Sequence, residues 1–184
     1  MSKACVFLAN GLEECEGLVT IDILRRAGVE VTTASIHEDK LISSSHNISF
    51  YADALANGLD MAQFDMVVLP GGLGGTNNLA ASALVAETVK AFAADETKLV
   101  AAVCAAPSVL GMLGLLQGKK ATCYPGFENH FCGGQYTGDY VTVCENIITG
   151  KGAGAAMLFG AAIADYFTNG KGTEVLSEMQ HIMQ

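Results

Sequence analysis

The residue of this sequence whose surroundings best suit covalent chemistry is Cys104. It follows the short apolar run 99–103 and precedes a helix-length stretch, 105–116. Ala102 and Ala106 are small enough for the tight strand-to-helix turn on which a nucleophile is presented. We expect the start of the helix to lower the pKa of the thiol and favour the thiolate. The alternative is burial as a small apolar side chain, the common fate of a free cysteine.

An acidic cluster after the first apolar run supplies a candidate partner for this thiol. Carboxylates at the start of a helix complement its dipole, and this explains Glu13 and Glu14. Glu16 lies one step further into the predicted helix, where it could point inward toward the sulfur. Burial would raise its pKa and allow it to move protons. Cys104 and Glu16 are therefore the candidate catalytic residues.

A glycine turn, Pro70-Gly71-Gly72, follows another apolar run, 64–69. Glycines let backbone N–H groups approach a substrate closely, as an oxyanion hole requires, although a plain turn is the alternative. The lysine and hydroxyl residue that end a phosphate-binding loop are missing. The spacing of 72–75 also breaks the dinucleotide-binding fingerprint. The sequence thus predicts no nucleotide cofactor.

Composition limits the class of protein. The chain has 184 residues, of which 51% are hydrophobic and 16% charged, and this predicts a single domain, 1–184, with a substantial core. A net charge of −9 makes nucleic acid and anionic membranes poor partners. The uncharged stretch 99–116 is long enough to span a membrane, but Pro107 interrupts it and a buried strand and helix fit better. With no export signal recognised, we expect a cytoplasmic location and reduced thiols.

Apolar runs alternate with helix-length stretches along the whole chain. Strands are expected at 3–9, 29–35, 64–69, 99–103, 121–124 and 140–149, a polar hairpin at 41–51, and helices at 13–27, 81–94, 105–116, 155–167 and 174–183. This order predicts an α/β three-layer sandwich: a mostly parallel sheet with helices on both faces. Ligands bind at the carboxyl ends of such strands, which is where Glu16, Gly71 and Cys104 fall.

Five segments together resemble the DJ-one/ThiJ/PfpI family, in its DJ-one branch. They are 8–16 (LANGLEECE), 22–28 (DILRRAG), 67–72 (VVLPGG), 101–107 (AAVCAAP) and 150–154 (GKGAG). The resemblance covers nearly the whole chain and implies a flavodoxin-like sandwich and a homodimer. It also implies an elbow cysteine, here Cys104, that is hydrogen bonded to a protonated glutamate, here Glu16. No metal or cofactor is implied.

The resemblance further places Gly71, Gly72 and the Ala105 amide around a small anion-binding pocket. Some relatives have a histidine where this chain has Tyr124, and relatives often have an arginine near the pocket where it has His46. These two residues are candidates for accessory roles.

Cys123 is expected close to the same pocket and is a further accessory candidate. It is the best candidate for a second reactive thiol. The other cysteines are better explained by packing or by exposure in loops.

Three functions follow, in order of preference. The first is a cofactor-independent glyoxalase or deglycase. It would convert methylglyoxal, glyoxal or their early glycation adducts to hydroxy acids through a Cys104 hemithioacetal, with Glu16 as general acid and base. The second is an oxidative-stress sensor or chaperone that acts through oxidation of Cys104. The third is a cysteine peptidase or amidase.

Overall fold

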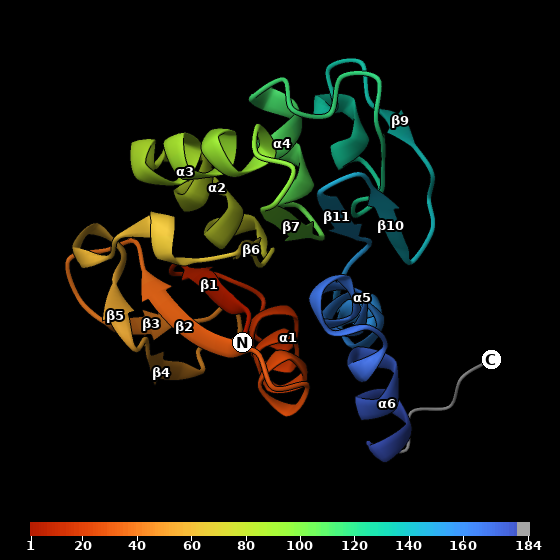
Figure 1. Ribbon diagram of the computed structural model, residues 1–184. Helices are drawn as coiled ribbons and strands as arrows, with labels where there is room; N and C mark the ends of the chain where they lie inside the picture. Colours follow the sequence, from red (N-terminus) through yellow and green to blue (C-terminus); the bar gives the residue numbers. More distant parts are fainter. Residues whose placement is uncertain (180–184) are drawn as a thin grey trace.

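A seven-stranded sheet runs through the middle of the molecule in the computed structural model, which describes residues 1–179 (Figure 1). Its strands are, in spatial order, β10 (Val141–Cys144), β11 (Ile147–Gly150), β7 (Leu99–Val103), β6 (Met66–Leu69), β1 (Lys3–Leu8), β2 (Glu30–Ser35) and β5 (Ala54–Leu55). Neighbouring strands are parallel except β10 and β11. The prediction of a mostly parallel sheet is confirmed, and the strand order is flavodoxin-like.

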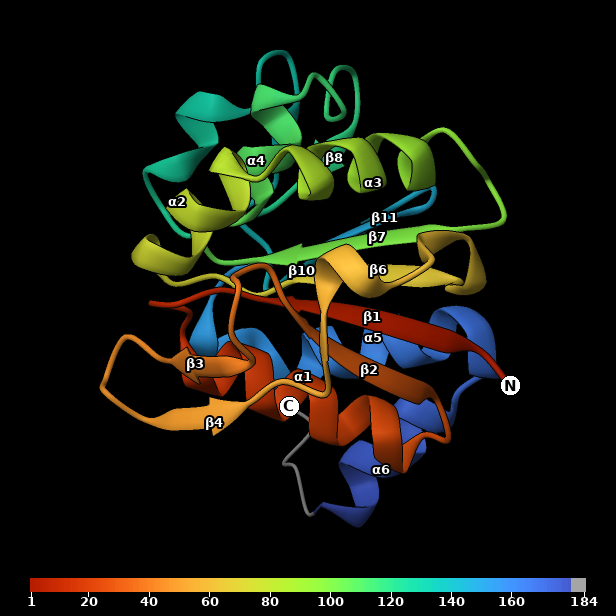
Figure 2. The ribbon, with the colours of Figure 1, turned by 90° about the vertical axis from the view of Figure 1, so that its left-hand side faces the viewer.

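Helices cover both faces of this sheet, as Figure 2 shows. One face carries α1 (Glu14–Arg26), α5 (Ala156–Thr168) and α6 (Lys171–Glu178). The other carries α2 (Leu73–Ala81), α3 (Ala83–Ala93) and α4 (Pro107–Met112). The predicted three-layer sandwich is therefore confirmed.

The central strands are apolar on both sides because each face of the sheet is covered. In β1, Val6 and Leu8 pack in the core under α1 and α5, whereas Cys5 and Phe7 pack in the core under α3 and α4. All four side chains are fully buried. Such a strand appears in the sequence as a continuous apolar run rather than as an alternation.

Smaller elements lie at the edges of the sandwich. β3 (Leu41–Ser43) and β4 (Ser49–Tyr51) form the antiparallel hairpin expected at 41–51. β8 (Lys120–Ala121) pairs with β9 (Gln135–Tyr136), so the strand expected at 121–124 ends earlier than predicted. Four short 3-10 helices complete the described elements: η1 (Ala56–Gly58), η2 (Met61–Gln63), η3 (Phe127–His130) and η4 (Ala153–Ala155).

Two helices differ from the prediction. The helix expected at 105–116 is α4, which ends at Met112 and is followed by Gly114 in the left-handed region at φ 76°. α2 was not expected, because glycines at 74 and 75 are poor helix formers. A Cβ at Gly75 would lie 2.7 Å from the Cα of Leu12, so the glycine allows the helix to approach the loop after β1 closely.

The stretch 99–116 is not a membrane span but β7 followed by α4. Within residues 1–179, none of the helices combines the length and the apolar character that crossing a bilayer needs. α6 begins at Lys171, three residues before the predicted start, and the end of the predicted helix 174–183 lies outside the described residues. All six cysteines fall within the described part of the chain, and all are free.

Candidate active site

Cys104 occupies the turn that leads from β7 into α4, at the carboxyl end of the sheet. Its backbone is left-handed, with φ 63°. Its N–H donates to the Gly150 carbonyl at 2.9 Å, and its carbonyl accepts from the Tyr124 N–H at 2.9 Å. A non-glycine residue in this region costs about 1–3 kcal/mol and persists only where its neighbours enforce it. The two hydrogen bonds hold the strained turn and leave the half-buried thiol at its tip.

Glu16 projects from the first turn of α1 into the interior, where only 1% of its surface is exposed. Its Oε2 accepts the Gly71 N–H at 3.0 Å. Its Oε1 is buried and has no hydrogen-bond partner among the described residues. Burial raises the pKa of this carboxyl to about 7, against the smaller lowering effects of the Cys104 thiol and the Gly71 amide. The acid therefore changes protonation state near neutral pH.

The two turn glycines bring the acid and the thiol together. A Cβ at Gly71 would lie 2.5 Å from both the Cys104 Cβ and the Glu16 Oε2, so only glycine fits between them. Gly72 is left-handed, at φ 84°, and is the N-cap residue of α2. The backbone N–H groups of Gly72 and Ala105 hydrogen bond the sulfur. The structure thus gathers all five residues that the sequence and the resemblance assigned to the pocket.

The predicted effect of the helix on the thiol is wrong. Burial and the charge of Glu16 raise the pKa of Cys104 to about 12, and the Gly72 and Ala105 amides lower it only in part. α4 itself begins three residues later, at Pro107, and has only six residues. Glu16 therefore ionises before the thiol, and near neutral pH its carboxylate is the base that can accept the thiol proton.

Two of the accessory candidates are not available to the site: His46 lies away from the thiol, and Cys123 is fully buried. His46 is exposed, and its Nδ1 lies 2.8 Å from Glu14 Oε1 rather than on the thiol. Cys123 is fully buried, and its Sγ lies 4.0 Å from Glu128 Oε2. Burial and that carboxylate raise the pKa of Cys123 to about 12. The prediction of a second reactive thiol at Cys123 is wrong, because neither access nor ionisation is available to it.

Tyr124, the third accessory candidate, does lie beside the site. It lines a hollow of about 270 Å³ together with Tyr140 and the loop after β11. A Cβ at Gly152, in that loop, would lie 3.5 Å from the Tyr124 ring and 3.9 Å from Glu16 Oε1. Sequence reasoning missed Tyr140, which no motif marks. The glycine-rich segment 150–154 was noted only for its resemblance.

Comparison with known proteins agrees with this geometry. The model of the DJ-1/PfpI family matches residues 2–166. The chain belongs to the DJ-1/PfpI family. Protein dj-1beta of Drosophila melanogaster is 38% identical over 168 residues, which cover 90% of this chain and 89% of that protein. The glutathione-independent glyoxalase DJ-1 of Schizosaccharomyces pombe is 29% identical over 174 residues, 90% of this chain and 91% of that protein.

Solved structures of DJ-1/PfpI proteins have the same fold. The oxidized DJ-1 of Toxoplasma gondii superposes with a TM-score of 0.94 at 31% sequence identity, and the match covers 100% of both chains. The whole chain therefore shares the fold of that protein.

A cluster on the surface of this DJ-1/PfpI protein offers ligand atoms for a cation. Those of Glu13, Glu14 and His46 all lie within 4.8 Å of one another. The arrangement needs no ion to explain it, because Ser45 and His46 hydrogen bond the two carboxylates. It remains a polar surface cluster beside the first turn of α1.

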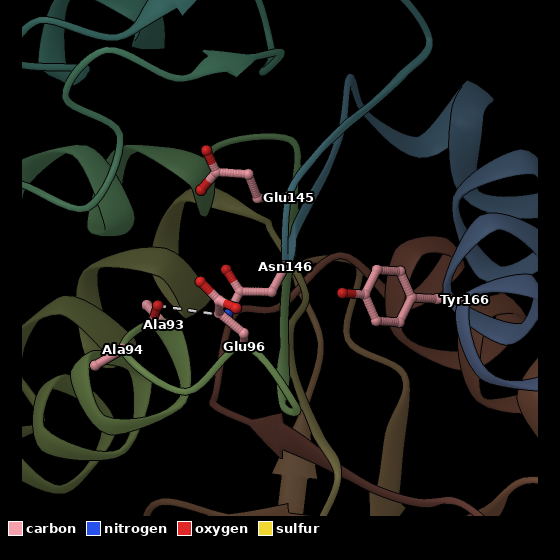
Figure 3. Close-up of a pocket in the computed structure, with 6 residues that line it drawn as sticks. All are labelled: Ala93, Ala94, Glu96, Glu145, Asn146 and Tyr166. Carbon is pink, nitrogen blue, oxygen red and sulfur yellow. Dashed lines mark hydrogen bonds between the residues drawn. The ribbon is translucent and has the colours of Figure 1, made fainter.

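A second hollow, of about 500 Å³, lies at the opposite end of the sheet (Figure 3). Its lining residues are Ala93, Ala94, Glu96, Glu145, Asn146 and Tyr166. The Asn146 side chain donates to the Ala93 carbonyl and to those of Phe92 and Asp95, and so ties the end of α3 to the sheet. This hollow is larger than the one beside Cys104, but no cysteine is among its lining residues.

Proposed function

We propose that this DJ-1/PfpI protein is a cofactor-independent glyoxalase and deglycase that converts methylglyoxal, glyoxal or their early glycation adducts to hydroxy acids. The observation that carries the proposal is the buried Glu16 carboxyl, which adjoins the thiol of a strained Cys104 and whose Oε1 has no hydrogen-bond partner within residues 1–179. A relative from Schizosaccharomyces pombe that bears the name glutathione-independent glyoxalase supports the same reading.

The first step forms a covalent intermediate. The Cys104 sulfur attacks the aldehyde carbon of the substrate, and the thiol proton passes to the Glu16 carboxylate as the S–C bond forms. The aldehyde oxygen becomes an oxyanion near the N–H groups of Gly72 and Ala105, which stabilise it. Protonation of that oxygen gives a hemithioacetal.

The second step moves a hydrogen between the two substrate carbons. Glu16 in its carboxylate form removes the proton from the former aldehyde carbon and returns a proton to the neighbouring carbonyl carbon. The first carbon is thereby oxidised to a thioester and the second reduced to an alcohol, so no external oxidant or reductant is consumed. Water then cleaves the S–C bond, releases the hydroxy acid and restores the thiol.

Lactate formation from methylglyoxal tests the proposal. Cys104→Ala and Glu16→Gln should each lower kcat/KM by about 10²–10⁴-fold, since each removes a nucleophile or a general base. Cys144→Ala removes a thiol on β10 and serves as the matched control, with activity retained. Full turnover by Glu16→Gln contradicts the mechanism.

The pH profile gives a second reading of the same pair. Because burial raises the pKa of Glu16 to about 7, its carboxylate form accumulates as the pH rises through that value. We expect kcat/KM to rise about tenfold per pH unit below 7 and to level off above it. A profile that is flat from pH 5 to 8 contradicts Glu16 as the base.

An oxidative-stress sensor is the second candidate function. The N–H groups of Gly72 and Ala105 point at the sulfur and would stabilise a sulfinate formed by two equivalents of peroxide, with release of two waters. Mild peroxide and intact mass spectrometry measure this, followed by a lactate assay. Selective oxidation of Cys104 in a protein that does not turn over dicarbonyls favours sensing, with chaperone activity then the property to test.

A cysteine peptidase or amidase is less favoured. Peptide cleavage must protonate an amine leaving group, which in cysteine peptidases is the task of a histidine. His37 accepts a hydrogen bond from the Asn10 N–H, and His46 is bonded to Glu14, so both are engaged away from the thiol. Turnover of casein or of simple amides would revive this function.

A homodimer is part of the proposal. Leu18 on α1 and Tyr51 on β4 are 39% and 73% exposed and line one shallow hollow on the surface. An apolar patch of this kind suits contact with a second copy of the chain. Light scattering should give twice the monomer mass, and Tyr51→Glu should shift the mass toward the monomer.

A further inference from the structure

The hollow beside the Cys104–Glu16 pair has apolar walls that the proposed reaction on methylglyoxal does not use. It measures about 270 Å³ and lies between two loops at the carboxyl end of the sheet. Its walls are formed by Tyr124, Pro125, Tyr140, Lys151 and Ala153. Both tyrosines are more than half exposed, at 54% and 64%, so the core does not cover their rings.

The hollow lies close to the catalytic acid, which is not itself part of its lining. Gly152 separates the two, and a Cβ there would lie within 4 Å of both the Tyr124 ring and Glu16 Oε1. That oxygen is buried and has no partner among the described residues. The backbone N–H of Tyr124 donates to the Cys104 carbonyl, so the main chain that carries the ring is tied to the reactive turn.

Within residues 1–179, Lys151 is the one charged residue that lines the hollow, and it lines it with the methylene groups of its side chain. The Lys151 Nζ donates to the Gly138 carbonyl at 2.9 Å, and its N–H donates to the Tyr140 carbonyl at 2.9 Å. With the ammonium group engaged at the rim, the methylene stem remains to line the space. The hollow is therefore suited to an aromatic or branched aliphatic group rather than to a charged one.

The proposed mechanism says which part of a substrate comes here. In the hemithioacetal, sulfur is bonded to the former aldehyde carbon, and the neighbouring carbonyl carbon carries the substrate's side group. Glu16 must reach both carbons to move the proton, so the side group leaves the reacting atoms on the side of the acid. Beyond Glu16 Oε1 on that side lie Gly152 and Tyr124.

We propose that Tyr124 and Tyr140 bind the side group of the substrate and make this protein selective for α-oxoaldehydes with an aryl or branched alkyl group over methylglyoxal. The inference rests on the proposed glyoxalase function and adds a substrate class to it. A methyl group leaves most of the hollow to water, whereas a phenyl ring contacts both tyrosines. One methylene in an apolar pocket is worth about tenfold or more in kcat/KM, and we expect at least that preference for phenylglyoxal.

Steady-state kinetics on two substrates tests the selectivity. The ratio of kcat/KM for phenylglyoxal, measured as mandelate, to that for methylglyoxal, measured as lactate, should be about tenfold or more in the wild type. Tyr124→Ala and Tyr140→Ala should each lower the ratio several-fold, and Tyr124→Phe should retain it. Tyr166→Ala changes a partly exposed tyrosine on α5 at the opposite end of the sheet and is the matched control, with no change in the ratio.

A second measurement reads the hollow without requiring turnover. Cys104 displaces iodide from iodoacetamide or from N-benzyl iodoacetamide, with an S–C bond formed, a C–I bond broken and the thiol proton released. The benzyl reagent should react faster relative to its rate with a free thiol, and Tyr124→Ala should remove the difference. Mass spectrometry of the modified peptide gives both rates.

The two measurements separate the two proposals. A wild type that turns over neither aldehyde overturns the glyoxalase function and the aldehyde class, while a benzyl preference that depends on Tyr124 upholds the apolar binding site. Turnover of both aldehydes at equal efficiency, with a ratio that Tyr124→Ala does not change, overturns the selectivity and leaves the glyoxalase function standing. Equal alkylation rates in wild type and variant overturn the binding site itself.

Discussion

At the carboxyl end of the sheet, Glu16 Oε1 is buried and finds no hydrogen-bond partner in the described part of the chain. At the amino end, the buried Asn146 side chain donates to the carbonyl groups of three residues. Each end also has a non-glycine residue in the left-handed region: Cys104 at φ 63° and Glu145 at φ 54°. The hollow at the amino end is the larger of the two, at about 500 Å³ against about 270 Å³.

The comparison teaches that the size of a hollow does not locate the chemistry. Buried polar groups are nearly always hydrogen bonded, and an exception indicates strain or a functional role. Among the described residues three buried side-chain oxygens are such exceptions, on Glu16, Thr20 and Thr76. Of these, only the Glu16 oxygen belongs to an ionisable group, and that group adjoins the reactive thiol. At the amino end the polar groups serve to attach α3 to the sheet, and the cavity is a consequence of how helices and strands meet.

Gly71→Ala is expected to have the largest effect. Its new Cβ would lie 2.5 Å from the Cys104 Cβ and from Glu16 Oε2, so acid and thiol must move apart. Misplacement by about 1 Å can cost 10²-fold in rate, and overpacking costs about 1–3 kcal/mol in stability. Lactate formation and urea unfolding measure the two losses.

Gly58→Ala is the matched control for that variant, because a Cβ at Gly58 meets nothing within 4 Å. It should change neither the rate nor the unfolding midpoint. A Gly71→Ala protein with wild-type activity would show that the spacing of acid and thiol is less critical than the contrast between the two ends implies.

The difference between the two ends could be predicted only in part from sequence. The apolar runs fix the strands, and their carboxyl ends bring residues 16, 71 and 104 to one edge of the sheet. The Gly71 N–H to Glu16 Oε2 hydrogen bond spans 55 positions and has no signal in local sequence. The raised pKa of Cys104 could not be predicted from sequence either, because it depends on burial and on the distance to Glu16.

Helix α2 illustrates a different failure of sequence reasoning. Glycines at 74 and 75 favour a loop by intrinsic propensity, yet both lie in a helix. The tertiary contact decides, since a Cβ at Gly74 would lie 3.2 Å from the Gly11 Cα. Residues without side chains allow this helix to lie against the loop after β1, which is the loop that leads to Glu16.

Glu16→Gln should reveal the cost of keeping an acid at the reactive end. The folded-state pKa of Glu16 is raised from 4.5 to about 7, so its stabilising contribution is fully present below pH 4.5 and is lost as the pH rises toward 7. A glutamine loses nothing over that range. At about 1.4 kcal/mol per pKa unit, the variant should be more stable than wild type by roughly 3 kcal/mol at pH 8.

Urea unfolding at pH 4 and at pH 8 measures this difference. At pH 4 the two proteins should be nearly equal, because the wild-type acid is protonated in both states. Glu87→Gln alters an exposed carboxyl on α3 and should show no such pH dependence. If the difference in stability between Glu16→Gln and wild type is the same at pH 8 as at pH 4, the pKa of Glu16 is not raised in the folded protein.

Asn146→Ala tests the opposite end. It leaves the Phe92 and Asp95 carbonyls without the amide donor they now share. Loss of a buried hydrogen-bond partner costs about 1–3 kcal/mol, so the unfolding free energy should fall by about 2 kcal/mol. Because the reactive pair lies across the sheet, kcat for methylglyoxal should stay within about twofold of wild type. Asn129→Ala, at an exposed position of η3, is the control and should leave both quantities unchanged.

Glu145→Gly is expected to have the smallest effect and asks whether strain at the amino end has any role in activity. The left-handed backbone of Glu145 costs about 1–2 kcal/mol that glycine avoids. The greater flexibility of glycine in the unfolded chain offsets about 0.5–1 kcal/mol of that gain in stability. Loss of the exposed ion pair between Glu145 and Lys119 offsets at most about 1 kcal/mol more. The variant should therefore be at most about 1.5 kcal/mol more stable than wild type, with unchanged lactate formation. Glu145→Gln removes the ion pair but keeps the strain, so the difference between the two variants isolates the backbone contribution. A fall in activity in Glu145→Gly would mean that strain at the amino end, like that at Cys104, serves the reaction.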